Sequence, residues 1–288
     1  MLERSGIMPC MNKLSTAERS QIIAMMVEGN SVNSIVRMTG RSNNTILKLL
    51  KDIGEACQKF HDEKIRGLAC KRIQCDELWN FCYAKQKNVP PHMQGKFGVG
   101  DVWTWTAIDA DTKLMISWLV GNRNGEWAKR FMNDVADRLL HRVQLTTDGL
   151  TSYLDAVYEA FENDIDYAQL IKIYGSVTGG AGTGGGRYSP PPLLSIEQRT
   201  HCGNPEQKHV STSFVERSNL TWRMTMRRFT RLTNGFSKKV ENMEHAVALT
   251  FTFYNFCRIH KTLRVTPAME AGLTDHVWEI SELVALLD

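Results

Sequence analysis

The stretch from Ile73 to Phe81, Ile-Gln-Cys-Asp-Glu-Leu-Trp-Asn-Phe, decides the fold of this chain. Apolar and aromatic residues recur through it, which predicts a β-strand that begins after the polar pair Lys71 and Arg72. The predicted strand carries an aspartate, Asp76, in its middle. A carboxylate in a half-buried strand needs a cation, hydrogen bonds or a metal ion to offset its lost hydration. Asp76 is therefore the first candidate for a functional site.

Two later carboxylates stand at comparable places. Asp148 follows the short predicted strand 143–147, and Glu216 lies near the start of a helical pattern. An acid just past the carboxyl end of a strand lies at the rim of a sheet, where open α/β sheets place their chemistry. We expect Asp76, Asp148 and Glu216 to converge and hold divalent metal. Two simpler interpretations stay open: Asp148 as the N-cap of the next helix, and Glu216 in a capping box with Ser213.

Length and composition favour a protein that works in the cytoplasm on a polyanion. A chain of 288 residues allows one large core and a small added domain, and 42% hydrophobic with 23% charged residues is typical of a globular protein. The net charge of +4 is mild, but the segment 217–240 has seven Lys and Arg residues and no Asp or Glu. No apolar run reaches the roughly 20 residues of a membrane span, and no signal peptide opens the chain. We expect a cytoplasmic, nucleoid-associated protein with no membrane partner.

The cysteines predict no disulfide framework. All seven are scattered, which favours a reducing compartment. Cys70, Cys75 and Cys82 form a loose group, but no C-x-x-C or H-x-x-x-H pair accompanies them. We expect buried or idle thiols and no zinc.

Residues 13–56 show three short helical patterns with Ser15, Ser31 and Ser42 as their N-caps. The third pattern is amphipathic, and a tight turn with glycine precedes it. Such an arrangement is typical of a helix-turn-helix, which presents its second helix to the major groove of DNA. The alternative is a helical hairpin whose charged side is merely solvated. The residues expected to contact DNA here are Arg41, Asn43, Asn44, Lys48 and Lys51.

From residue 71 the periodicity changes from helical to strand-like. Asp109 and Asp111, between the second and third predicted strands, are better explained by turn chemistry than by a metal site. The alternation of strands and helices predicts an α/β domain with a mixed sheet. Strands are predicted at 73–81, 102–108, 114–120, 143–147 and 167–173, and helices at 126–140, after Asp148, and at 240–262.

These patterns divide the chain into five segments. The Gly-rich stretch 175–193 lacks the Lys and Ser or Thr that close a phosphate-binding loop, so we expect a mobile insertion there. The segments are a disordered tail at 1–12, a DNA-binding domain at 13–56, a linker at 57–70, a catalytic domain at 71–235, and C-terminal helices packed on it at 236–288.

A helix is predicted from Ser213 to about Phe229, with an apolar face toward the sheet. At about 100° per residue, Glu216, Arg223 and Arg227 fall close together on another face. An acid followed by two guanidinium groups suits a metal ligand followed by phosphate clamps, although ordinary surface charge explains it as well. The expected DNA contacts of this basic segment are Arg223, Arg227, Arg228 and Arg231.

Several strings of the sequence resemble the bacterial insertion-sequence type 1 transposases. They are CDELW at 75–79, TDG at 147–149, SFVERSNLT at 213–221, MRRFTRLTN at 226–234 and YNFCRIHKTL at 254–263. The resemblance spans residue 12 to about residue 272, and it implies a DDE transposase. Its RNase H-like catalytic domain would have a mixed five-stranded sheet with helices on both faces. In it Asp76, Asp148 and Glu216 are the matching catalytic acids and metal ligands. The cysteine zinc motif of some members is not visible here.

The implied reaction is DNA strand cleavage and strand transfer with two Mg²⁺ ions, for which Mn²⁺ can substitute. Asp76 would be the shared ligand, with Asp148 and Glu216 each completing one site. The implied partner is double-stranded DNA, both the terminal repeats of the element and the target, and pairing two ends requires a homodimer or a higher oligomer. The alternatives are a catalytically silent DNA-binding protein derived from a transposase, and a nuclease without strand transfer.

Overall fold

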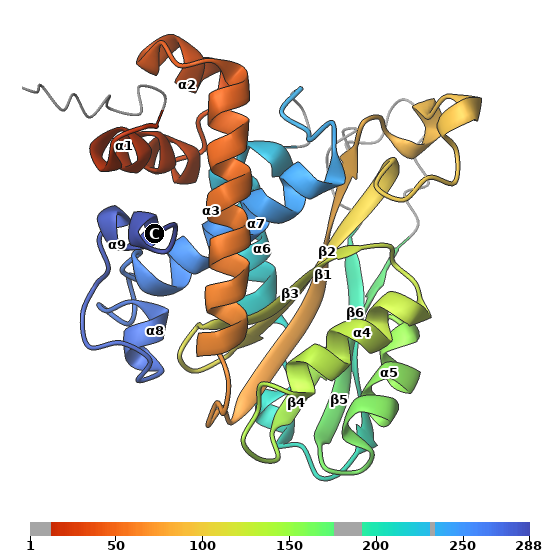
Figure 1. The fold of residues 1–288 in the computed structure, drawn as a ribbon. Helices are drawn as coiled ribbons and strands as arrows, with labels where there is room; N and C mark the ends of the chain where they lie inside the picture. The colour runs from red at the N-terminus through yellow and green to blue at the C-terminus, as the bar shows by residue number, and fades with distance from the viewer. Residues whose placement is uncertain (1–12, 176–191, 231–233) are drawn as a thin grey trace, which may run out of the picture.

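The computed structural model describes residues 13–175, 192–230 and 234–288. The expected tail at 1–12, most of the Gly-rich insertion and the expected DNA contact Arg231 lie outside the described residues. The chain has a mixed α/β fold in which helices cover one twisted β-sheet (Figure 1). Within the described ranges, no helix combines the length and the apolar character that crossing a membrane would need.

The sheet has six strands in the order β3-β2-β1-β4-β5-β6. β1 pairs antiparallel with β2 and parallel with β4, so β1 lies at the centre of a mixed sheet. β3 pairs antiparallel with β2, β5 pairs parallel with β4, and β6 pairs antiparallel with β5. The strands are β1 (Arg72–Cys82), β2 (Gly100–Asp109), β3 (Met115–Gly121), β4 (Gln144–Thr147), β5 (Asp166–Tyr174) and β6 (Leu193–Cys202).

The prediction of five strands is wrong because it misses β6. This strand is the edge of the sheet, and its residues are exposed or half-buried along its whole length. A strand with both faces in contact with water does not need alternating apolar and polar residues, so the pattern that reveals the other strands is absent. The first residue of β6 also falls in the segment assigned to the Gly-rich insertion.

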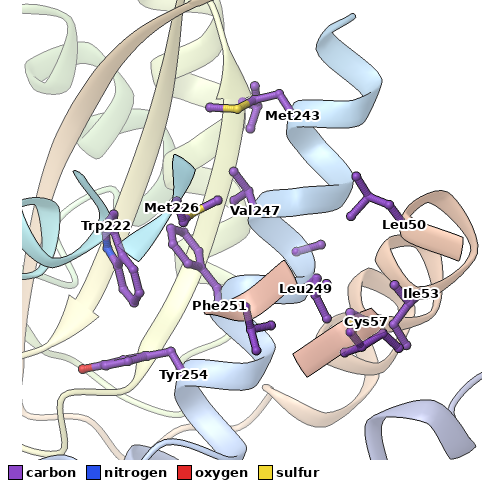
Figure 2. Packing of buried hydrophobic residues seen from close by; sticks show 14 of the residues in the cluster. Leu50, Ile53, Cys57, Trp222, Met226, Met243, Val247, Leu249, Phe251 and Tyr254 are labelled. Carbon is purple, nitrogen blue, oxygen red and sulfur yellow. The ribbon is translucent and has the colours of Figure 1, made fainter. Parts of the chain in front are cut away.

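Helices cover both faces of the sheet. Met115 and Ile116 are neighbours on β3 and point to opposite faces, so they belong to two different hydrophobic cores. Figure 2 shows α7 in the first core between α6 and α3, with Phe251 toward Trp222 at a ring distance of 4.6 Å and Leu249 toward Cys57. The first core holds α3 (Asn43–Lys64), α6 (Ser213–Thr225) and α7 (Val240–Phe256), and the second holds α4 (Gly125–Ala136) and α5 (Ser152–Phe161).

The three N-terminal helices begin at the predicted caps. The hydroxyls of Ser15, Ser31 and Ser42 each accept a backbone N–H of the first turn of α1 (Thr16–Val27), α2 (Val32–Thr39) and α3. Their buried residues join the same core as α7 and one face of the sheet, and α1 also contacts the C-terminal helix α9 (Ile280–Ala285). The N-terminal helices are therefore packed onto the sheet domain and do not have a core of their own.

The predicted linker at 57–70 is largely helix, because α3 continues to Lys64. The buried face of α3 continues from Ile53 through Cys57 to His61. Polar residues between these positions mask the helical pattern in the sequence. Gly54 permits the close approach of α7: a Cβ at this position would lie 2.4 Å from the Cβ of His245. The C-terminal half of α3 is thus a structural part of the α/β domain.

Three predicted helices end earlier than expected, and the first is α4, which ends at Ala136 instead of residue 140. α6 ends at Thr225 instead of Phe229, since Met226 is extended and a short 3₁₀ turn follows at Arg227–Phe229. Thr225 bonds its hydroxyl back to the carbonyl of Thr221, a competition that weakens helices. α7 ends at Phe256 instead of residue 262, and its last carbonyl accepts the backbone N–H of Trp278. The remaining short helix is α8 (Pro267–Glu270).

Candidate metal centre and DNA-binding surface

The sheet opens between β1 and β4 at the level of Asp76, and we call this opening the crevice. β1 pairs with β4 only from Arg72 to Gln74, so Asp76 lies two residues past the last pair. Asp148 directly follows the end of β4. β1 connects to β2 on one side, whereas α4 carries the chain across to β4 on the other, so the connections change direction here. Ligands of open α/β sheets bind at such a switch point, outside the carboxyl ends of the strands.

Asp76 is held by neutral donors. Its Oδ2 accepts a hydrogen bond from Asn219 Nδ2 at 2.7 Å, and its Oδ1 accepts one from the backbone N–H of Glu77 at 2.8 Å. Across the described part of the chain, no ion pair joins Asp76 to a cation. Burial, and then the negative charge of Asp148, raise the pKa of Asp76 to about 7. A carboxylate in this state gains a great deal from an arriving cation.

Glu77 is a site residue that sequence reasoning missed. Its side chain is 1% exposed, and one ligand oxygen each of Asp76, Glu77 and Asp148 lie within 4.8 Å of one another. Burial, and then the charge of Asp148, raise the pKa of Glu77 to about 7. The Tyr153 hydroxyl lies close enough to lower this pKa, yet neither it nor Glu77 Oε1 makes a hydrogen bond of normal geometry. The adjacent acids Asp76 and Glu77 could have indicated this role. Successive residues of a strand ordinarily point to opposite faces, however, so only one of the two is expected at the site.

Arg123 links two of these carboxylates. Its Nε donates to Glu77 Oε2 at 2.9 Å, and its Nη2 lies 3.6 Å from Asp148 Oδ2. The guanidinium also lies over the ring of Trp103, 4.8 Å from the centroid. Arg123 follows β3 in a polar turn, where a single arginine gives no sequence signal. It supplies the positive charge that a buried Glu77 requires.

Asp148 supports the turn that leads into α5. Its Oδ1 accepts the backbone N–H of Leu150 at 2.9 Å, while the N-cap of α5 is Thr151. The interpretation of Asp148 as that N-cap is therefore wrong. Its other oxygen, Oδ2, faces Arg123.

Glu216 is not a member of the Asp76, Glu77 and Asp148 group, although its charge is near enough to contribute to the raised pKa of Asp76, after burial and the charge of Asp148. Lys172 Nζ donates to both of its carboxylate oxygens at 2.5 Å, and Thr212 Oγ1 donates to Oε1 at 2.5 Å. No capping box with Ser213 forms, because Thr212 is the N-cap and Ser213 is the first helical residue. The structure thus brings two of the three expected acids together and holds the third nearby on a lysine.

α6 is fixed to β1 by a side chain of the strand. Gln74 Oε1 accepts the backbone N–H groups of Phe214 at 2.8 Å and Val215 at 3.1 Å, which satisfies donors that the first turn of a helix leaves open. Asn219, one turn after Glu216, then reaches Asp76. Glu216 therefore lies on a helix whose position over the crevice is set by β1.

The donor set fits a hard divalent cation. Carboxylate oxygens are the ligands that Mg²⁺ and Mn²⁺ prefer in proteins, and the Asp76, Glu77 and Asp148 group offers only such oxygens. Burial and then the charge of Asp148 raise the pKa of Asp76 and of Glu77, and a cation bound between the carboxylates would relieve both effects. This crevice is the candidate metal centre.

Two other groups of potential ligands have structural roles. Asp109 accepts the backbone N–H of Asp111 and the hydroxyl of Thr112, and Asp111 pairs with Arg72, so the predicted turn chemistry is confirmed. The six described cysteines are free thiols. Burial raises the pKa of Cys82 to about 12, which suits a packed thiol.

The expected DNA contacts on α3 form an exposed group at its start. Asn43 and Asn44 occupy the first turn with exposed side chains, and Arg41 just before it pairs with Glu18. Lys48 pairs with Asp52 at 2.6 Å and Lys51 with Glu55 at 3.7 Å along the helix. All of these positions are open to a partner, although acids along the helix neutralise part of the positive charge.

The arginines after Glu216 do not share one helix face. α6 ends before Arg227, so the predicted line of one acid and two guanidinium groups is wrong. Arg223 donates to the backbone carbonyls of Trp79 and Phe229, and Arg228 donates to Ser237 while burial lowers its pKa. Of the three, Arg227 is the exposed one.

No family model and no curated protein matches the sequence. Among solved structures, the chain is similar to a piggyBac transposase synaptic complex with hairpin DNA, at 11% identity and a TM-score of 0.41, over 99% of this chain and 73% of that one. It is also similar to a Mos1 transposase paired-end complex with the left transposon end, at 11% identity and a TM-score of 0.24, and to a Mos1 mariner paired-end complex with Mn, at 13% and 0.22. These two matches cover 58% and 56% of this chain, and 61% and 60% of the Mos1 chains. Scores of this size carry no weight for function.

Proposed function

We propose that this chain is the DDE transposase of an insertion sequence, which binds the ends of its element and cuts and joins DNA strands with divalent metal. The observation that carries the proposal is the meeting of Asp76 and Asp148, 72 positions apart in the sequence, at the opening of the sheet beside Glu77. The resemblance of the surrounding strings to the insertion-sequence type 1 transposases supports it. So does a mixed sheet with helices on both faces, as expected of an RNase H-like domain.

The residues that would hold Mg²⁺ or Mn²⁺ are Asp76, Asp148 and Glu216, with Glu77 beside them. A bound pair of ions supplies an activated water and stabilises the leaving 3′ oxygen. Asp76 would be the shared ligand because the charges of both Asp148 and Glu216 act on it and because it has no cation of its own in the described part of the chain. Asn219 orients its carboxylate through the 2.7 Å hydrogen bond.

DNA would contact the start of α3 and the basic segment after α6. The proposed contacts are Arg41, Asn43, Asn44, Lys48 and Lys51 on the first surface, and Arg227 and Arg231 on the second. Arg223 and Arg228 belong to the same basic segment, and each would have to leave its protein partner to contact DNA. Phosphate contacts position a protein on DNA, whereas the two asparagines are of a type that reads adenine in the major groove. A homodimer or larger oligomer, acting on DNA in the cytoplasm, would pair two element ends.

The test is a supercoiled plasmid that carries the ends of the element, incubated with the full-length protein and Mg²⁺ or Mn²⁺. We expect nicked and joined products from the wild type. Asp76→Asn should bind the ends with unchanged affinity and form no product, because it removes the shared ligand with little change in size. Full cleavage by Asp76→Asn would overturn the proposal.

One observation favours a second candidate, a silent DNA-binding protein derived from a transposase. Glu216 is engaged by Lys172 and stays outside the acidic group, so the structure has two of the three expected acids in place. The same plasmid assay separates the two functions. A shifted band without any nick or joined product, in Mg²⁺ and in Mn²⁺, would select the silent protein.

A further inference from the structure

The ion pair of Lys172 and Glu216 joins two elements that border the candidate metal centre, β5 and α6. β4 pairs with β5 only as far as Gln169, so Lys172 lies on the part of β5 that continues past the end of β4. This part borders the crevice, since a Cβ added to Gly149 would lie 3.1 Å from Ile171. From there Lys172 reaches Glu216 on α6 and binds both of its carboxylate oxygens.

We propose that Lys172 is a positioning residue that holds Glu216 away from Asp76 and Asp148 until a DNA phosphate replaces Glu216 as the partner of the lysine. This inference rests on the proposed function. It assigns to one lysine the coupling between DNA binding and completion of the metal centre.

The contacts around Asp76 explain why Glu216 needs a holder. Asn219 lies three residues after Glu216, on the neighbouring part of the helix surface, and already touches Asp76. A turn of the Glu216 side chain toward Asn219 therefore brings its carboxylate toward the crevice. Without metal, that movement would add a fourth carboxylate to three that already crowd one another. Lys172 gives Glu216 an opposite charge instead.

The pair is built to exchange partners. The Lys172 side chain is 25% exposed and that of Glu216 is 42% exposed, so water screens their attraction. Exposed ion pairs contribute little net stability, and a lysine bonds a phosphate oxygen as readily as a carboxylate oxygen. DNA that enters the crevice would take Lys172 and release Glu216 to the metal. By thermodynamic reciprocity, metal would in turn strengthen DNA binding.

The experiment measures Mn²⁺ affinity of the full-length protein by electron paramagnetic resonance of the unbound ion, with and without a DNA duplex that carries an element end. DNA should tighten Mn²⁺ binding to the wild type. Lys172→Met should bind Mn²⁺ about two- to fivefold more tightly than the wild type without DNA, the size of an exposed ion pair. The same variant should gain less from DNA. Lys172→Arg keeps the charge, so its DNA-free Mn²⁺ affinity should stay closer to that of the wild type than to that of Lys172→Met.

A double-mutant cycle separates the holder from general electrostatics. Glu216→Gln should leave DNA-free Mn²⁺ affinity within about twofold of wild type and remove the gain from DNA. In that background, Lys172→Met should have no further effect. An equal effect of Lys172→Met in both backgrounds would overturn the inference, because the lysine would then act only through its charge. The proposed metal centre is tested apart from this by Asp76→Asn, which should lose Mn²⁺ binding; unchanged binding there would overturn the centre itself.

Discussion

The two cations at the crevice hold their carboxylates in different ways. Arg123 is planar, lies over Trp103 and bridges Glu77 and Asp148, and the Glu77 side chain is 1% exposed. Lys172 is a point charge on a flexible stem, and its partner Glu216 is 42% exposed. A buried carboxylate that loses its cation has no other group to compensate its charge, whereas an exposed carboxylate is solvated by water. The sheet side of the site is therefore fixed, and the α6 side can exchange partners.

Removal of Arg123 should have the largest effect on stability. Arg123→Met removes the cation that pairs with the buried Glu77 and with Asp148 and that lies over Trp103, so we expect the free energy of unfolding to fall by about 3 kcal/mol at pH 8, as for a broken buried pair. Urea unfolding measures it. The control is Lys129→Met, which breaks the exposed pair with Glu159 and should leave the free energy of unfolding nearly unchanged. Equal costs for the two variants would erase the contrast between fixed and exchangeable pairs.

The fixed side should also make stability depend on pH. The pKa values of Asp76 and Glu77, about 7, lie above their ordinary values of 3.8 and 4.5. Between these limits the folded chain binds more protons than the unfolded chain, so the free energy of unfolding falls as the pH rises toward 7. We expect Asp76→Asn to lose about 2 kcal/mol less than the wild type between about pH 5 and pH 7.5, in metal-free buffer. Urea unfolding at each pH measures the difference.

Two outcomes would contradict this account of the fixed side. One is a metal-free wild type whose free energy of unfolding increases between about pH 5 and pH 7.5, if Asp76→Asn lacks that increase. The other concerns metal: Mn²⁺ needs deprotonated carboxylates, so it should stabilise the wild type more at the upper pH than at the lower one. Stabilisation by Mn²⁺ that is independent of pH would place the ion elsewhere.

A smaller effect should come from the contact that fixes α6. Gln74→Ala leaves the backbone N–H groups of Phe214 and Val215 without their acceptor, at a cost of about 1 to 2 kcal/mol in unfolding. Amide hydrogen exchange in α6 should accelerate, while exchange in β1 and β2 stays slow. Gln198→Ala removes a 3.3 Å side-chain hydrogen bond to Val210 at the edge strand and is the control. Unchanged exchange in α6 would show that its position does not depend on β1.

Much of the fold could be predicted because its signals are local. The caps of the N-terminal helices are short sequence patterns that act within one turn, and the five predicted strands alternate or run apolar. β6 is exposed, so burial leaves no pattern in its sequence. The end of α6 depends on Thr225 and on packing near Gly29, where a Cβ would lie 2.4 Å from the Thr225 carbonyl oxygen. That contact joins segments almost 200 positions apart.

The site was less accessible to sequence reasoning than the fold. Asp148 follows from the rule that places chemistry at strand ends, Asp76 follows from the cost of a carboxylate inside a strand, and the two do meet. The roles of Glu77 and Arg123 arise because β1 and β4 stop pairing after Gln74. The number of residues over which two strands pair cannot be read from the sequence of either strand. Lys172 reaches Glu216 because β5 is longer than β4. Such differences in length appear only when the strands are aligned in space.

The shared core of α3, α7 and the sheet has a geometrical consequence for the proposed transposase. Gly54 seats α3 directly on α7, so packed side chains, and no tether, set the span from the first turn of α3 to the crevice. Such a molecule would hold the recognised sequence and the scissile bond at a fixed distance from each other. Base pairs inserted between the recognised sequence and the scissile bond would displace the cut along the strand, and the protein would not stretch to follow them.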